Sequence, residues 1–242
     1  AGVLRIQGDD VQAESMLRDA LAIRRRLFGN EHLVIAETLN NLANVLLNRR
    51  DYAAAEPLCS EVLAIRRQLL GDEHPQVAQA IHNLGVLLGR QGRIAEAEPL
   101  LRQSIALYRK QLGPDHPELA GGLLNLGELL FKAGDAAIAE PLLRECLEIR
   151  RRSLPERDAR TVKTLQTLGG CLVMLHKYAE AEPLLIEGHQ AQAGARSAGH
   201  AATLASLQAL IDLYEAWDRP SEAARYRTLL TEQATTGAAT PE

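Results

Sequence analysis

Apolar residues recur at helical spacing along most of this chain. From about residue 35 to residue 48 they fall three or four positions apart, at Leu39, Leu42, Ala43, Leu46 and Leu47. This spacing places them on one face and predicts an amphipathic helix. A polar turn at Arg49–Asp51 follows, and a second helix is predicted from about Tyr52 to Leu70. The pattern therefore predicts two helices joined by a tight turn.

The same pair of helices recurs every 42 residues. A turn of the form Gly-x-x-His begins at Gly29, Gly71 and Gly113; Ala-Glu-Pro begins at Ala55, Ala97, Ala139 and Ala181; and Ile-Arg-Arg begins at Ile23, Ile65 and Ile149. A fixed period of this length is typical of helical solenoids. The Gly and Pro residues at the repeat turns exclude a continuous coiled coil. The arginine pairs are expected to complement the dipole at the helix ends.

Small and large residues alternate at set places in each predicted pair. The first helix carries Leu-Ala or Leu-Gly pairs, and the second carries a small residue followed four positions later by a large one: Leu42-Ala43, Leu84-Gly85, Leu126-Gly127 and Leu168-Gly169; Ala55, Ala97, Ala139, Ala181 and Ala223; Cys59, Leu101, Leu143 and Leu185. A small residue lets two helices approach closely, and a large neighbour fills the remaining space. HEAT and armadillo repeats have a similar period. The positional pattern favours tetratricopeptide (TPR) repeats instead.

At this level of detail the chain resembles a known family. The unit combines G-[ND]-[DE]-H-P, L-N-N-L-A, A-E-P-L and I-R-R, and it resembles the TPRs of kinesin light chain and its bacterial relatives over residues 1–234. The first copy lacks the proline, having Leu33, and copies four and five lack the Gly-x-x-His-Pro turn. The resemblance implies an all-α, right-handed TPR α-solenoid. It has about five and a half helix-turn-helix repeats of 42 residues, with boundaries near residues 29, 71, 113, 155 and 197.

The repeat register also gives expectations for the two ends. Ala1 aligns with Ala43, inside a first helix, so the N-terminus is expected to be cut within a repeat. Arg227 takes the place of the large residue of the second helix, which is expected of a C-terminal capping repeat. Residues 235–242 are expected to form a disordered tail.

The resemblance implies a concave groove that is lined by the first helices and binds an extended peptide. By register, the candidate groove residues are Asn40, Asn41, Asn44, Asn48, Gln79, His82, Asn83, Arg90, Asn125, Glu128, Lys132, Lys163 and Gln166. Asn41, Asn83 and Asn125 occupy one slot in three consecutive copies. A side-chain amide both donates and accepts, so such a row suits a peptide backbone. The alternative is that each Asn bonds a neighbouring helix and serves packing.

The charges in this set suggest a preference. Arg90, Lys132, Lys163 and His82 could form a basic strip that suits an acidic segment or a terminal carboxylate. The alternative is ordinary solvated charge, with Glu128 as an ion-pair partner.

Composition narrows the function classes. The net charge of −4 and the pI near 6.0 argue against a nucleic-acid partner. The chain contains no run of 18 apolar residues, so no membrane-spanning helix is predicted. Three cysteines give no disulfide framework, which favours a cytoplasmic location. Arginine greatly outnumbers lysine, which suggests a GC-rich and bacterial source.

No catalytic motif is present, so no enzyme activity, cofactor or metal is predicted. His32, His74 and His116 recur one repeat apart, too far to share a metal ion, and are expected to bond backbone at helix starts. Cys171 lies on a core stripe and is expected to be buried.

The sequence thus predicts a non-catalytic interaction module that binds an extended peptide of a partner protein. Two alternatives stay open. The solenoid could associate with itself through its first end, or it could be the regulatory arm of a larger signalling protein.

Overall fold

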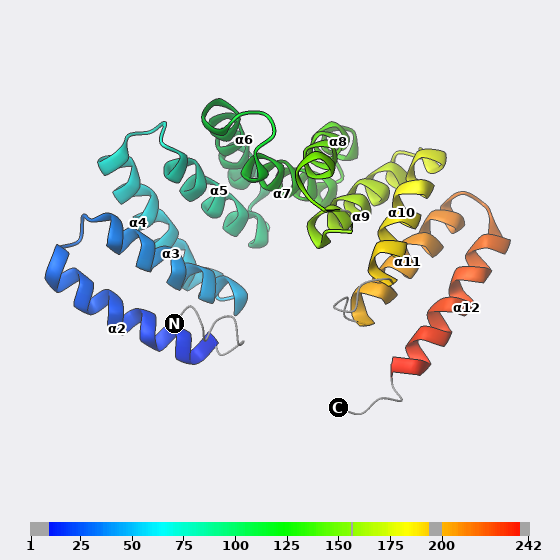
Figure 1. Ribbon diagram of the computed structural model, residues 1–242, viewed down its shortest axis with the longest axis horizontal. Helices are drawn as coiled ribbons and strands as arrows, with labels where there is room; N and C mark the ends of the chain where they lie inside the picture. Colours follow the sequence, from blue (N-terminus) through cyan, green and yellow to red (C-terminus); the bar gives the residue numbers. More distant parts are fainter. Residues whose placement is uncertain (1–9, 156, 194–199, 238–242) are drawn as a thin grey trace. The chain divides into compact units, whose positions relative to one another are not determined.

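The repeat pattern produces a chain built from pairs of antiparallel helices (Figure 1). The computed structural model describes residues 10–155, 157–193 and 200–237, and these residues form eleven helices and no strand. The first helices of the pairs are α3 (Leu33–Asn48), α5 (Pro75–Arg90), α7 (Pro117–Ala133), α9 (Ala159–Met174) and α11 (His200–Ala216). The second helices are α2 (Asp10–Phe28), α4 (Tyr52–Leu70), α6 (Ile94–Leu112), α8 (Ala136–Ser153), α10 (Tyr178–Ala193) and α12 (Pro220–Gly237). The predicted all-α solenoid of helix pairs is confirmed.

The helix bounds agree closely with the periodicity. Helix α4 has the predicted limits, and α3 begins two residues earlier than Ile35. The predicted tail is corrected in part, because α12 continues through Thr235 to Gly237. Residues 238–242 lie outside the described residues, as does most of the turn expected near residue 197.

The histidines of the repeat turns cap the helices that follow them. The Nδ1 atoms of His32, His74 and His116 accept hydrogen bonds from the backbone N–H groups two residues later, at 3.2, 3.1 and 3.1 Å. Each satisfies one of the N–H groups that a helix start leaves without an intrahelical partner. In copy four Asp158 takes this role, accepting from the N–H of Arg160 at 2.9 Å. The expected backbone role of the turn histidines is confirmed.

The turn inside each repeat needs one residue with positive φ. The same register position supplies it in five copies: Arg50, Gly92, Gly134, His176 and Asp218. Glycine adopts this conformation without steric cost, whereas the other side chains meet a modest penalty. The turn geometry is therefore set by the repeat and is kept even where the sequence does not favour it.

Close helix packing follows the alternation of small and large residues. Ala55, Ala97, Ala139, Ala181 and Ala223 are fully buried. A Cβ atom added at Gly127 would lie 2.6 Å from Cδ2 of Leu143, and one at Gly169 would lie 2.5 Å from Cδ2 of Leu185. A Cβ atom at either position would require the facing leucine side chain to move, so the predicted role of the Leu-Gly pairs is confirmed.

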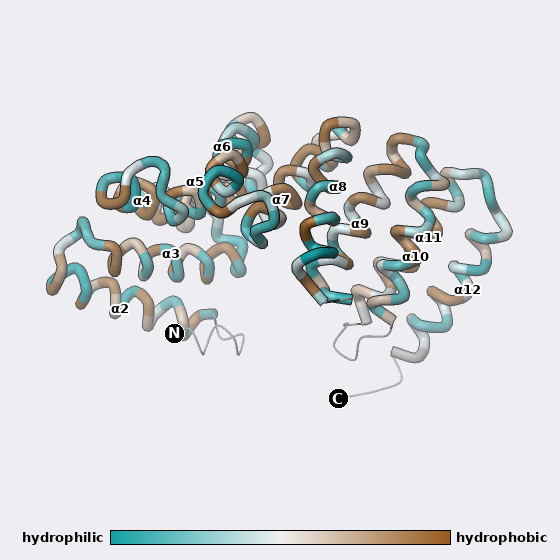
Figure 2. Tube along the Cα trace, turned by 45° about the horizontal axis from the view of Figure 1, so that its top comes forward, coloured by the Kyte–Doolittle hydropathy of each residue, from teal (hydrophilic) through white to brown (hydrophobic). Residues whose placement is uncertain are grey.

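The chain divides into two compact units, residues 1–114 and 115–242, beside the repeat boundary expected near residue 113. Within the first unit, each of the helices α2 to α6 contacts the next one along the chain. Within the second unit, α7 to α12 do the same, and α9 also contacts α7 and α11. Hydrophobic and hydrophilic segments alternate along the helices (Figure 2), as expected when one face of each is buried.

Candidate functional site

The first helices lie side by side within each unit. In the first unit, the Asn83 Nδ2 of α5 donates to the Asn40 Oδ1 of α3 at 2.9 Å. In the second unit, the Lys163 Nζ of α9 lies 2.9 Å from the Glu128 Oε1 of α7. Each unit therefore presents a layer of first helices, and the candidate groove residues lie on these layers.

Helix α3 carries the most accessible amides of the predicted set. Asn41 and Asn48 are exposed, and Asn44 is half-buried between them. Positions separated by three and four residues share one face of a helix. These three amides therefore form a short row, which we call the α3 amide row.

Other predicted amides are engaged in packing. Asn83 bonds Asn40, and the Gln79 Oε1 accepts a hydrogen bond from the buried Arg66 at 3.1 Å. In the second unit, the Gln166 Nε2 donates to the Gln192 Oε1 of α10 at 3.1 Å. These contacts correspond to the packing alternative. Asn125 is half-buried on α7.

His82 does not add positive charge near pH 7. Its Nδ1 is sealed from solvent, and its ring centroid lies 6.0 Å from that of the buried Tyr108. Burial lowers the pKa of His82 to about 4, because the charged form loses its hydration. The imidazole is therefore neutral at pH 7.

The remaining charges are arranged differently in the two units. Arg90 is exposed in the last turn of α5, and Lys132 is exposed near the end of α7. Lys163 is paired with Glu128, as the alternative interpretation anticipated. All three side chains are exposed, and Lys163 is the one of them that forms an ion pair within the described residues.

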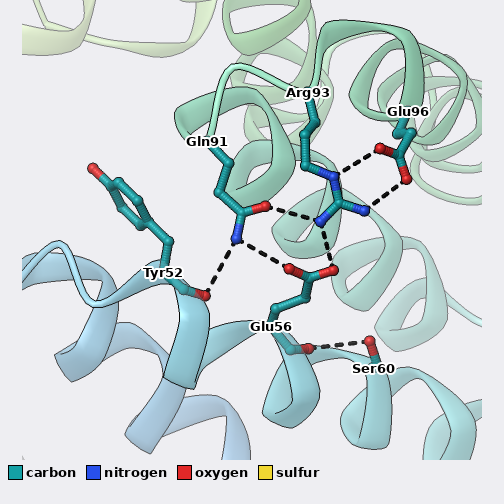
Figure 3. A network of polar contacts seen from close by, with 6 residues as sticks. All are labelled: Tyr52, Glu56, Ser60, Gln91, Arg93 and Glu96. Carbon is teal, nitrogen blue, oxygen red and sulfur yellow. Dashed lines mark hydrogen bonds and ion pairs between the residues drawn. The ribbon is translucent and has the colours of Figure 1, made fainter.

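The sequence analysis assigned no role to the glutamate of the Ala-Glu-Pro motif. The glutamate of Ala-Glu-Pro reaches the turn of the next repeat (Figure 3). The Glu56 carboxylate accepts from Gln91 Nε2 at 3.0 Å and from Arg93 Nη1 at 2.7 Å, and Arg93 also holds Glu96. The hydrogen bond from Arg93 lowers the pKa of Glu56. Recurrence of Glu at Glu14, Glu56, Glu98, Glu140 and Glu182 was the available signal.

The equivalent glutamates of three other repeats also contact the next repeat, each with a different partner residue. Glu14 pairs with Arg49, Glu140 lies 2.7 Å from Lys177 Nζ, and the Tyr214 hydroxyl donates to Glu182 at 2.7 Å. These contacts join successive repeats, so this glutamate has a structural role.

Comparison with known proteins agrees with this architecture. The family profile described as "Tetratricopeptide repeat" matches residues 1–47, 34–110, 88–152 and 118–192. The chain belongs to the tetratricopeptide repeat family. No curated protein matches this TPR chain.

Several solved structures share the fold of this TPR protein. BtubC (BKLC) from P. vanneervenii is 17% identical, with a TM-score of 0.81 over 96% of this chain and 94% of that chain. A putative kinesin light chain with nearly identical TPR-like repeats from Podosopora anserina is 23% identical, with a TM-score of 0.75 over 87% of this chain and 100% of that one. PilW, a type IV pilus biogenesis factor, is 16% identical, with a TM-score of 0.72 over 95% and 88%. At these identities the likeness concerns the fold.

The described part of the TPR chain offers little reactive chemistry. It contains no group of three or more metal-ligating side chains. Cys59, Cys146 and Cys171 are buried free thiols, and burial raises the pKa of Cys59 and of Cys171 to about 11. The buried position predicted for Cys171 is confirmed, and the Cys171 Sγ donates to the carbonyl of Ala136 at 3.1 Å.

Among the described helices, none has the length and apolar character needed to span a membrane.

Proposed function

We propose that this TPR protein is a non-catalytic module that binds an extended peptide segment of a partner protein in the cytoplasm. TPR proteins are in general scaffolds for protein–protein interaction, which supports the broader part of this proposal. The observation that carries the finer part is the α3 amide row of Asn41, Asn44 and Asn48. Asparagine is a poor helix former, so three of them on one accessible face need a reason other than helix stability.

The amide row suits a peptide backbone. Each amide offers two N–H donors and one carbonyl acceptor, which match the alternating groups of an extended chain. A helix that is already folded loses little conformational freedom on binding, so most of the ordering entropy is lost by the peptide alone.

We assign the selectivity among peptide sequences to charged side chains. Backbone recognition accepts many sequences, and exposed cations would favour segments rich in Asp and Glu. Arg90, which is exposed and belongs to the same unit as the α3 amide row, is the candidate cation. The partner is therefore proposed to carry an acidic segment, and nucleic acids and membranes are not proposed partners.

A peptide-display selection against the whole chain tests this proposal. Peptides enriched on the parent protein are expected to lose at least about tenfold in affinity for the Asn41→Ala/Asn48→Ala double variant, because several hydrogen bonds are lost together. Alanine is the better helix former, so the melting temperature is expected to stay level or rise.

The matched control is Gln103→Ala, which removes an exposed amide from the second helix α6. It is expected to bind the selected peptides as the parent does. Equal binding to the double variant, or no enrichment at all, would contradict the proposal.

A second candidate function is self-association, and one observation favours it. Helix α2 exposes large apolar residues: Val11, Met16, Ile23, Leu27 and Phe28. Ile23 is 58% exposed, whereas its register counterparts Ile65 and Ile149 are 5% and 0% exposed. Met16, Ile23 and Leu27 share one side of the helix by their spacing, and an exposed apolar side of this kind is typical of an interaction surface.

Light scattering across a concentration series separates the two functions. Self-association predicts a mass that rises with concentration in the parent and stays monomeric in Leu27→Glu. The control is Leu69→Glu at the same register position in α4, where the leucine is also exposed. A monomeric parent at every concentration would rule this second candidate out.

A further inference from the structure

The fourth repeat contains a cavity of about 370 Å³ that the other function proposals do not use. It lies in the second unit, where the end of α8, the loop to α9, the start of α9 and the last turns of α10 come together. The position of these three helices can be followed in Figure 1. Arg157, one of the residues that line the cavity, is exposed to solvent.

The repeat register explains why the cavity exists. Thr161 stands where the preceding copies have Leu119, Val77 and Ile35, all three fully buried. Ala191 stands where they have Ile149, Leu107 and Ile65. Two large apolar side chains are therefore replaced by smaller ones that line the same cavity.

Thr161 also brings a polar group into the space it opens. Its residue is only 7% exposed, and its Oγ1 has no hydrogen-bond partner in the part of the chain that the structure describes. A buried hydroxyl without a partner is unfavourable, so its presence in a lined cavity points to a ligand that bonds it.

The charges around the cavity indicate the sign of that ligand. Arg151 is paired with Glu187, and the neighbouring Asp158 is paired with Arg160. Within the described residues Arg157 forms no ion pair, and its exposed guanidinium belongs to the cavity lining. A guanidinium binds a carboxylate through two parallel hydrogen bonds.

The other lining residues are mostly apolar. They are Leu154, Pro155, Val162, Leu165 and Ala191, and Glu187 and Gln190 add polar groups from α10. A cavity with apolar walls and a few convergent polar groups is typical of a small-molecule site.

We propose that this cavity is a binding site for a small carboxylic acid with a short apolar chain. The carboxylate pairs with Arg157, the Thr161 hydroxyl donates to it, and the chain occupies the space left by the missing leucine and isoleucine side chains. The site is specific to the fourth repeat, because the earlier copies fill the same place with their own side chains.

A titration of the whole protein with hexanoate, followed by protein NMR, tests this assignment. We expect saturable shifts confined to residues around the cavity, with hexan-1-ol and inorganic phosphate each binding at least about tenfold more weakly, since each lacks one half of the recognition. Arg157→Gln is expected to weaken hexanoate by a similar factor. Arg26→Gln, an exposed arginine on α2, is the matched control and is expected to change nothing.

Substitutions that fill the cavity provide the second part of the test. Thr161→Leu and Ala191→Ile restore the residues of the earlier copies and are expected to abolish hexanoate binding while keeping or raising the melting temperature. Having two filling variants keeps the test valid if one of them fails to fold. The proposal is overturned if the parent shows no saturable binding at millimolar hexanoate, if a folded filling variant binds as the parent does, or if hexan-1-ol or phosphate binds as tightly as hexanoate.

Discussion

At the scale of single residues, the environment separates side chains that look alike in the sequence. Arg66 and Arg67 are adjacent in one Ile-Arg-Arg motif. Arg66 is buried and donates to the Gln76 carbonyl at 2.9 Å, in the first turn of the next repeat, whereas Arg67 is partly exposed and pairs with Asp72. The expectation that both arginines complement the helix dipole therefore covers only part of their role, because Arg66 also joins two repeats.

His82 gives a prediction at the same scale. Its pKa is about 4 in the folded protein and about 6.5 in an unfolded chain, so the folded state disfavours its protonation. The contribution of neutral His82 to stability is complete above pH 6.5 and is lost as the pH falls toward 4. We expect His82→Gln to flatten the pH dependence of the unfolding free energy in this range.

Urea denaturation at pH 7, 6 and 5 measures this effect. The difference in unfolding free energy between the parent and His82→Gln is expected to shift in favour of the variant as the pH falls. A difference that stays constant over the three pH values would show that the ring is solvated in the folded state.

At the scale of helices, the alternation of small and large residues fixes how closely two helices pack. Gly127 and Gly121 lie in the same helix, α7. A Cβ at Gly127 would overlap Leu143, whereas a Cβ at Gly121 has no neighbour within 4 Å. Helix packing therefore favours a glycine at position 127 but not at position 121.

Substitution by alanine should separate them. Gly127→Ala is expected to lower the unfolding free energy by about 1–3 kcal/mol, because Leu143 must move. Gly121→Ala is expected to raise it by about 0.5–1 kcal/mol, because the unfolded chain loses conformational freedom. Equal effects in urea denaturation would contradict the assigned packing.

At the scale of the whole molecule, the repeats are joined by a recurring set of polar links. Arg24 bonds Thr38 at 2.6 Å, Arg66 bonds Gln79, and Arg150 bonds Thr164 at 2.6 Å, each reaching the next first helix. Because each repeat contacts mainly its neighbours, stability in such arrays is a sum of local terms and nearest-neighbour interfaces.

Breaking one link should therefore have a local effect. Arg66→Met leaves the Gln76 carbonyl and the Gln79 amide oxygen without their donor, and this is expected to cost about 1–3 kcal/mol. Hydrogen exchange is expected to rise in α4 and α5 and to stay unchanged in α9 to α12.

The adjacent Arg67→Met is the control, since its ion pair with Asp72 is largely solvated and contributes little. A uniform rise in exchange along the chain after Arg66→Met would show that the array unfolds as one cooperative unit instead.

The sequence by itself determined the repeat, the helix pairs and the packing slots. Helical periodicity, caps and turns depend on residues within a few positions of one another, so α4 and the histidine caps could be predicted closely. The Leu-Gly pairs identified the close contacts because the same slot recurs in copies two to four.

Only the tertiary structure decided which polar residues remain accessible. Asn41 and Asn83 share one slot, yet Asn41 is exposed and Asn83 bonds Asn40 of the neighbouring helix. The repeat register shows that Thr161 and Ala191 are smaller than their counterparts, whereas the structure shows that both line one cavity. Burial and hydrogen bonding at these positions depend on side chains of other helices, and the local pattern carries no information about those distances.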